Sequence, residues 1–183
     1  LSPQTRGLLD GLTNDVTITL YYDKEDPLFT LVNALVNEYR LASPHIHVRT
    51  VDYIRDPADA AEVKVRHNLT SLTEKNLVIF DCEGRTKVVP ADMLAQYTIE
   101  QVPNAEQREF RKKPVFFLGE QVFSSVLLAV SQPRPLKAYY LVGHGEHAPD
   151  SGDEQMGYLK FTSLLRQNYV EVGLLTLLGT NQV

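Results

Sequence analysis

The residues best placed for chemistry form the loop Gly143-His144-Gly145-Glu146, which follows a short apolar stretch. An imidazole and a carboxylate can act as acid and base, and with His147 they could bind zinc. The spacing matches no established zinc motif, and no third ligand can be identified. A nucleophile elbow needs a Ser or Cys between glycines after a strand, and His144 stands there instead. We therefore expect Gly143, His144, Gly145 and Glu146 to bind a ligand or partner, with no catalytic residue, metal or cofactor.

Two other interpretations of this loop stay open. In the first, the glycines only form a turn after a strand, and His144 and Glu146 hydrogen-bond to nearby backbone. In the second, the protein is a hydrolase or amidotransferase-like enzyme that uses His144 and Glu146 as acid and base. No nucleophile or metal set accompanies them, so we expect a non-enzymatic protein.

Disulfide chemistry is not expected either. It needs an attacking thiol at the first strand-to-helix turn, and that turn, Asp23 to Pro27, has none. Cys82 is the single cysteine, which excludes an intrachain disulfide and a cysteine-rich zinc site but leaves the redox compartment open. No basic neighbour in the sequence favours its thiolate, so we expect a small, half-buried strand residue.

Composition narrows the classes of partner. The chain has 183 residues, with 18 basic and 23 acidic side chains, and its formal charge is −5. The longest basic run is Arg111-Lys112-Lys113, too short to track a phosphate backbone, so nucleic acid is not an expected partner. No apolar stretch of about 18 residues could span a bilayer. We expect any targeting or anchoring segment to lie outside this sequence.

The elements that position these residues begin with an α/β layer. Residues 16–22 alternate with a period of two, as in a strand, and residues 46–53 form a second strand. Between them, Asp26-Pro27 predicts a helix start, followed by apolar residues on one face that should cover the sheet: Leu28, Leu31, Val32, Leu35 and Val36. A shorter helix follows Asp56-Pro57 and runs to about residue 66. The resulting β-α-β crossover predicts a parallel strand pair.

A hairpin and a helix should complete this layer. Residues 76–82 and 85–89 flank Glu83-Gly84, whose glycine suits a tight turn, so two antiparallel strands are predicted. Residues 91–97 have helical tendency. The order β-α-β-α-β-β-α is that of a thioredoxin-like domain, which we assign to residues 1–97.

The rest of the chain should form a connection and a partial second domain. Residues 98–113 are polar and weakly periodic, which predicts a surface connection, and an apolar helix is predicted at 119–130. Pro133-Arg134-Pro135 then marks a boundary, so the connection covers 98–135. Residues 136–183 predict a β-loop-α-β unit. One such unit cannot cover both faces of a parallel sheet, which predicts the start of a second α/β domain.

Four segments together resemble GldG-like proteins, which are auxiliary components of ABC transporters known from gliding-motility systems. They are residues 1–9 (LSPQTRGLL), 16–22 (VTITLYY), 119–125 (GEQVFSS) and 140–146 (YLVGHGE). The resemblance implies a membrane-anchored protein at the extracytoplasmic, periplasmic face of a bacterial inner membrane. It also implies that residues 136–183 begin a Rossmann-like domain similar to class I glutamine amidotransferases but without their nucleophile.

The resemblance implies a function in transport without catalysis. We expect an extracytoplasmic binding or assembly module whose partners are the transporter permease or other membrane subunits, with a small solute as a possible ligand. The family defines no catalytic residue that can be carried over, and the role of Gly143 to Glu146 is not specified by it. A purely structural spacer is the remaining alternative.

Overall fold

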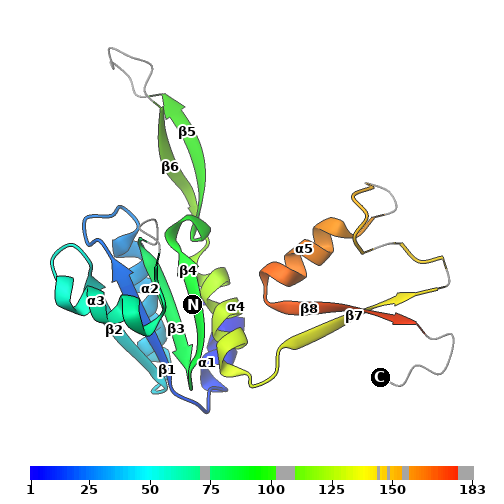
Figure 1. Cartoon of the computed structure of the whole chain (residues 1–183), viewed down its shortest axis with the longest axis horizontal. Coiled ribbons are helices and arrows are strands. Elements are labelled where there is room, and N and C mark those ends of the chain that lie inside the picture. Colours follow the sequence, from blue (N-terminus) through cyan, green and yellow to red (C-terminus); the bar gives the residue numbers. More distant parts are fainter. Residues whose placement is uncertain (71–74, 102–109, 144, 148, 154–156, 177–183) are drawn as a thin grey trace. The chain divides into compact units, whose positions relative to one another are not determined.

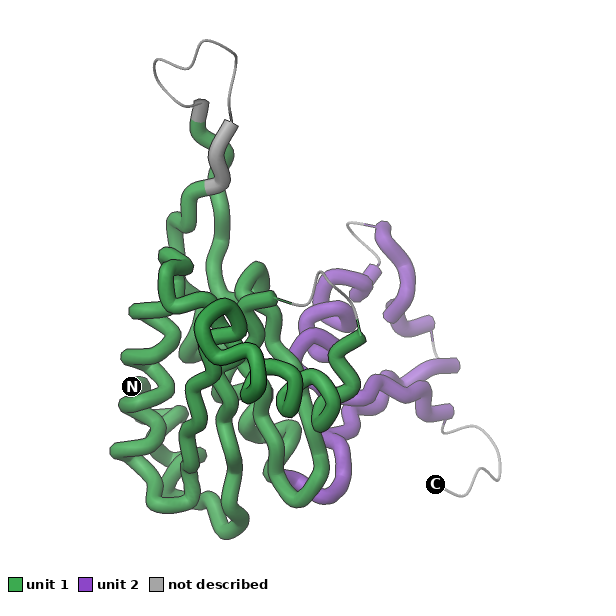
Figure 2. Tube along the Cα trace, turned by 60° about the vertical axis from the view of Figure 1, so that its left-hand side comes forward, with its two compact units in different colours: residues 1–131 green, residues 132–183 purple. Residues whose placement is uncertain are grey.

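The protein has a mixed α/β fold, seen in a computed structural model that describes residues 1–70, 75–101, 110–143, 145–147, 149–153 and 157–176 (Figure 1). The chain is divided into two compact units, residues 1–131 and residues 132–183 (Figure 2). The elements are α1 (Pro3–Asp10), β1 (Val16–Tyr22), α2 (Phe29–Ala42), β2 (Ile46–Asp52), α3 (Pro57–Arg66), β3 (Leu77–Cys82), β4 (Arg85–Pro90), the 3-10 helix η1 (Ala91–Met93), β5 (Ala95–Gln101), β6 (Phe110–Phe117), α4 (Gly119–Ser131), β7 (Leu136–Val142), α5 (Leu159–Gln167) and β8 (Val170–Thr176).

The first unit is built on a four-stranded sheet in the order β2-β1-β3-β4. Strands β1 and β2 are parallel, whereas β3 runs antiparallel to both β1 and β4. The hairpin turn has positive φ at Glu83 (53°) and Gly84 (82°), as a two-residue type I′ turn requires. The predicted parallel pair and the predicted hairpin are therefore both confirmed.

Helices cover both faces of this sheet because neighbouring strand residues point to opposite sides. On one face, Tyr21 and Ile79 share an apolar cluster with Ala60 and Val63 of α3. On the other face, the ring of Phe80 lies 5.3 Å from that of Phe123 in α4. Helices α1 and α2 adjoin α4, so the sheet lies between α3 and a layer formed by α1, α2 and α4.

Helix α2 covers the sheet with a narrower stripe than the sequence predicts. Its buried residues are Val32, Val36 and Tyr39, and Leu28 before its first turn is also buried. Leu31 is 48% exposed, so its predicted burial is wrong. At about 100° per residue Leu31 falls at the edge of the stripe, where it reaches solvent. The helix begins at Phe29, and Asp26 Oδ1 accepts a hydrogen bond from the Leu28 N–H at 2.8 Å.

The segment between β4 and α4 differs from the prediction. In place of a helix at 91–97 and an irregular connection at 98–113, η1 is followed by the antiparallel pair β5 and β6. Residues 96–99 (QYTI) alternate with a period of two and are rich in β-favouring types, a signal that outweighs the helical tendency. Pro114 lies opposite Tyr97, beside an irregularity in the strand pairing, where a strand tolerates proline. The last helix of the predicted β-α-β-α-β-β-α order is therefore α4 and not residues 91–97. Helix α4 matches the helix predicted at 119–130.

The second unit is the predicted β-loop-α-β unit. Strands β7 and β8 pair in parallel, and α5 packs against β8. Thr162 of α5 is buried and donates a 2.7 Å hydrogen bond from Oγ1 to the carbonyl oxygen of Pro149. No helix in the described part of the chain is long and apolar enough to cross a membrane.

Candidate functional site

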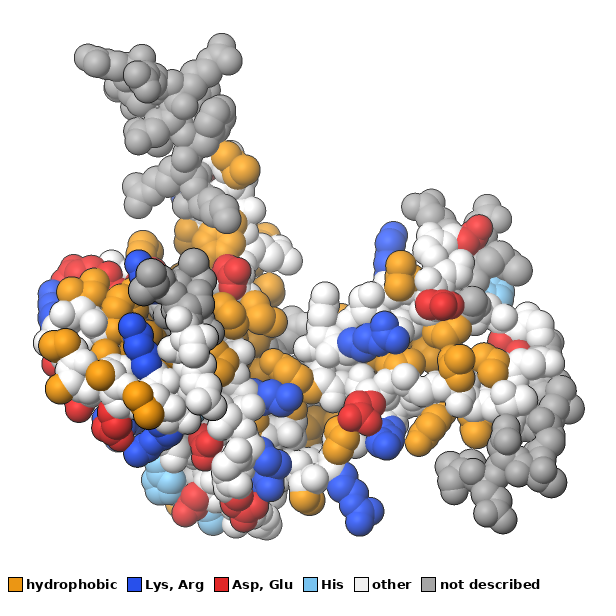
Figure 3. Space-filling view, viewed as in Figure 1, with side chains coloured by type: hydrophobic (Ala, Val, Ile, Leu, Met, Phe, Trp, Pro, Cys, Tyr) orange, Lys and Arg blue, Asp and Glu red, His pale blue; other side chains and the backbone are white. Residues whose placement is uncertain are grey.

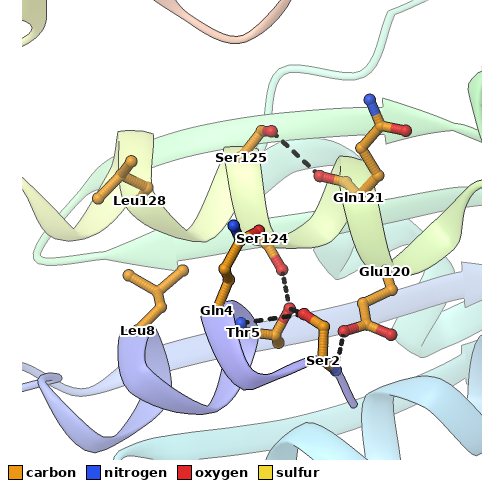
Figure 4. A pocket seen from close by; sticks show the side chains of 9 residues that line it. All are labelled: Ser2, Gln4, Thr5, Leu8, Glu120, Gln121, Ser124, Ser125 and Leu128. Carbon is orange, nitrogen blue, oxygen red and sulfur yellow. Dashed lines mark hydrogen bonds between the residues drawn. The ribbon is translucent and has the colours of Figure 1, made fainter.

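A groove lined by polar and apolar side chains lies between α1 and α4 (Figure 4). Helix α1 begins after Ser2, whose hydroxyl oxygen accepts a hydrogen bond from the Thr5 N–H at 3.2 Å, and Pro3 occupies its first turn. This helix was not predicted from the sequence, although Ser2-Pro3 is a recognisable helix start. The groove has a volume of about 570 Å³ and is lined by Ser2, Gln4, Thr5, Leu8, Glu120, Gln121, Ser124, Ser125 and Leu128.

A chain of hydroxyl groups joins the two helices beneath the groove. Thr5 Oγ1 and Ser124 Oγ are 2.9 Å apart, and the hydroxyl of Tyr39 lies 2.8 Å from Ser124 Oγ. The same tyrosine donates to the carbonyl oxygen of Glu120 at 3.2 Å. Burial raises the pKa of Tyr39 to about 12, so the hydroxyl keeps the one proton that it donates to Glu120, and it can accept from Ser124 Oγ.

A carboxylate marks the end of the groove at the first turn of α4. The N–H of Ser2 donates to Glu120 Oε1 at 2.5 Å. This hydrogen bond is the largest cause that lowers the pKa of Glu120 below its usual value. Because the ionised form is favoured, the groove carries a negative charge at neutral pH. Leu8 and Leu128 lie at its other end (Figure 4).

Hydrogen bonds with Asn76 hold the turn from Asp23 to Pro27, where disulfide chemistry would need a thiol. Asn76 Oδ1 accepts hydrogen bonds from the Asp23 N–H at 3.0 Å and from the Tyr53 hydroxyl at 3.1 Å. Its Nδ2 donates to Asp26 Oδ2 at 2.7 Å. Asn76 has a φ of 52°, a conformation that asparagine adopts more readily than most residues. The role of Asn76 was not predicted from the sequence, since the single signal was an asparagine before a strand.

Cys82 lies at the carboxyl end of β3 and is fully buried, more than the half-buried position predicted. A basic group does adjoin it in space: Arg85 donates from Nη2 to Cys82 Sγ at 3.4 Å. The same arginine donates from Nε to the carbonyl oxygen of Val130 at 2.8 Å. The sequence analysis considered immediate neighbours alone and missed this contact, which arises because the hairpin folds Arg85 back onto the strand.

The predicted binding loop, Gly143 to Glu146, follows β7 in the second unit. Gly143 and Gly145 have φ values of 113° and 89°, so both glycines adopt conformations that other residues rarely take. His144 lies outside the described residues. The ring of His147 lies 5.4 Å from that of Tyr158, just before α5. Among the residues that the structure describes, no group of three or more His, Cys, Asp or Glu side chains is arranged to hold a metal ion.

Residues 1–117 match the family described as "Domain of unknown function (DUF7088)", and the chain belongs to this family. No curated protein matches the sequence. Two solved structures of the alkylhydroperoxide reductase AhpF from Enterococcus faecalis are similar to it: the NTD_N/C domain, with a TM-score of 0.43, and a mutant of AhpF, with 0.44. Each is 12% identical, over 93% of this chain and 75% of the other.

Proposed function

We propose that this protein is a non-enzymatic binding or assembly module in a GldG-like auxiliary component of a bacterial ABC transporter. The observation that carries the binding role is the hairpin formed by β5 and β6, which projects from the four-stranded sheet of the first unit (Figure 1). A two-stranded hairpin is marginally stable by itself, so a projecting one gains stability when another surface covers it.

The hairpin exposes apolar side chains to solvent. Tyr97 and Ile99 lie on one face, since they are two residues apart in β5. Ile99 is 68% exposed. On the opposite face Lys113 Nζ pairs with Glu100 Oε1 at 3.1 Å. The side chain of Phe116, opposite Gln96 near the end of β6, is also exposed, and Figure 3 shows apolar side chains along the described part of the hairpin. Exposed apolar side chains on a projecting hairpin are typical of a contact surface.

The rest of the fold supports the two domain assignments in this proposal. The strand order β2-β1-β3-β4, with α3 on one face of the sheet and α2 and α4 on the other, supports a thioredoxin-like domain. The parallel pair of β7 and β8 supports the start of a Rossmann-like, amidotransferase-like domain. The resemblance to GldG-like proteins supplies the transporter context, with permease or other membrane subunits as partners at the extracytoplasmic face of the inner membrane.

The proposal is tested by purifying the tagged full-length protein from detergent-solubilised membranes of its source. We expect a permease and an ATPase subunit of one ABC transporter to co-purify in fixed proportion. Tagged protein that is recovered without either subunit, under conditions where those two subunits remain associated with each other, contradicts the transporter role.

A further inference from the structure

The groove between α1 and α4 offers a second contact surface, which shares no residue with the hairpin formed by β5 and β6. The two helices run in the same direction and in step, as their contacts show. Ser2 meets Glu120 at their first turns, and Thr5 meets Ser124 one turn later. Leu8 and Leu128 line the next turn (Figure 4). Two adjacent helices leave a groove between them, and the side-chain ridge of a third helix can pack into it.

The side chains that this groove presents differ along its length. The hydroxyls of Thr5 and Ser124 are bonded to each other, so they form its floor. Glu120 places a carboxylate at one end, and Leu8 with Leu128 places apolar surface at the other. Leu128 is eight positions after Glu120 in α4, which corresponds to about 12 Å along the helix.

Charge and spacing together indicate the occupant. We propose that the groove binds an α-helix of a partner protein that carries a Lys or Arg against Glu120 and an apolar residue against Leu8 and Leu128. These two residues would lie about seven or eight positions apart, which is two turns and the same face of a helix. The cation would form a charge-assisted hydrogen bond with a carboxylate that the Ser2 N–H already holds in place.

The probes are two fluorescein-labelled, alanine-rich helical peptides of about 15 residues, with one Lys and one Leu about seven positions apart in either order. Fluorescence anisotropy measures their binding to the full chain. We expect at least one peptide to bind saturably, and binding to weaken as salt increases. Glu120→Gln should weaken it about tenfold, because glutamine can still accept from the Ser2 N–H but carries no charge. The matched control is Glu83→Gln, a glutamate at the β3–β4 turn, which should leave binding unchanged.

Further outcomes decide between occupants. A peptide with Glu in place of Lys should not bind, and Leu128→Ser should weaken binding while the melting temperature shows that the protein is folded. If neither peptide binds at about 1 mM, or if Glu120→Gln leaves binding intact, the proposal is wrong. If octylammonium binds in a Glu120-dependent way while both peptides fail, the groove takes a small amphiphilic amine and the helix is rejected. These results do not depend on recovery of transporter subunits, so the two proposals can fail separately.

Discussion

The side-chain amide of Asn76 donates a hydrogen bond of 2.7 Å from Nδ2 to Asp26 Oδ2, and so ties the start of β3 to the turn before α2. With the bonds that its Oδ1 accepts from Asp23 and Tyr53, one side chain joins three segments. These three hydrogen bonds hold the turn in place.

Asn76→Ala should therefore destabilise the protein by about 1–3 kcal/mol in urea unfolding. Asn68 provides a matched control because its φ is also 52°. Asn68→Ala carries the same backbone strain and tests it without the network around Asn76. Equal losses for the two variants would show that backbone strain alone matters and that the hydrogen bonds contribute nothing.

Two buried tyrosines should respond differently to loss of their hydroxyl. Tyr39 bonds to Ser124 and to the carbonyl oxygen of Glu120. The hydroxyl of Tyr22 has no hydrogen-bond partner in the part of the chain that the structure describes. We expect Tyr39→Phe to cost about 1–2 kcal/mol, and Tyr22→Phe to be neutral or stabilising. Chemical denaturation measures both, and a larger loss for Tyr22→Phe would contradict the hydrogen-bond assignment.

Alkaline pH should destabilise the protein partly through Tyr39. Burial raises its pKa to about 12 in the folded state, above the value of about 10 expected in an unfolded chain. The contribution of Tyr39 to the free energy of unfolding is fully present below pH about 10. It is lost as pH rises towards 12, because Tyr39 releases its proton at a lower pH in the unfolded chain than in the folded one. In Tyr39→Phe, the urea midpoint should fall less steeply between pH about 9 and 11.5. Tyr22, whose pKa burial also raises, should retain part of the slope. Identical slopes in the variant and the native protein would exclude a contribution from Tyr39.

The stripe of α2 gives a comparison of two leucines. Leu28 is 4% exposed and Leu31 is 48% exposed. We expect Leu28→Ala to cost about 2–5 kcal/mol, as for other buried leucines. Leu31→Ala should stay within about 1 kcal/mol, because its side chain already meets solvent. Thermal or urea unfolding of the two variants side by side is sufficient. Similar losses at both positions would mean that Leu31 is covered, as a partner or a second copy could cover it.

Much of the first unit follows from local patterns in the sequence. The alternation at 16–22 predicts β1, and Glu83-Gly84 predicts the hairpin turn, because in each case neighbouring residues carry the signal. The hairpin formed by β5 and β6 was missed because the alternation at 96–99 is short and was divided between the helix predicted at 91–97 and the connection predicted from residue 98. The groove was missed because its two walls are more than 100 residues apart, as the bond between Thr5 and Ser124 shows. Which distant helix meets α1 is decided by tertiary packing, which no local pattern reports.

The loop Gly143 to Glu146 shows a second limit of prediction from sequence. Its glycines indicated a turn, and the positive φ values of Gly143 and Gly145 agree with that. Its role in binding remains a prediction, because His144 lies outside the described residues. Side-chain chemistry could be proposed from the sequence there, but its geometry requires the surrounding chain.

The most direct test of the binding role compares two substitutions on opposite faces of the hairpin formed by β5 and β6. Ile99→Glu and Thr98→Glu place the same carboxylate at neighbouring positions of β5, whose side chains point to opposite faces of the hairpin, so both should affect the strand pairing alike. Recovery of the permease and ATPase with the tagged full-length protein is measured together with its melting temperature. The account predicts that Ile99→Glu reduces recovery at least fivefold, about 1 kcal/mol, while recovery with Thr98→Glu stays unchanged and the two variants melt at the same temperature. Full recovery with Ile99→Glu would contradict the proposal that the exposed apolar side chains of the hairpin bind the transporter.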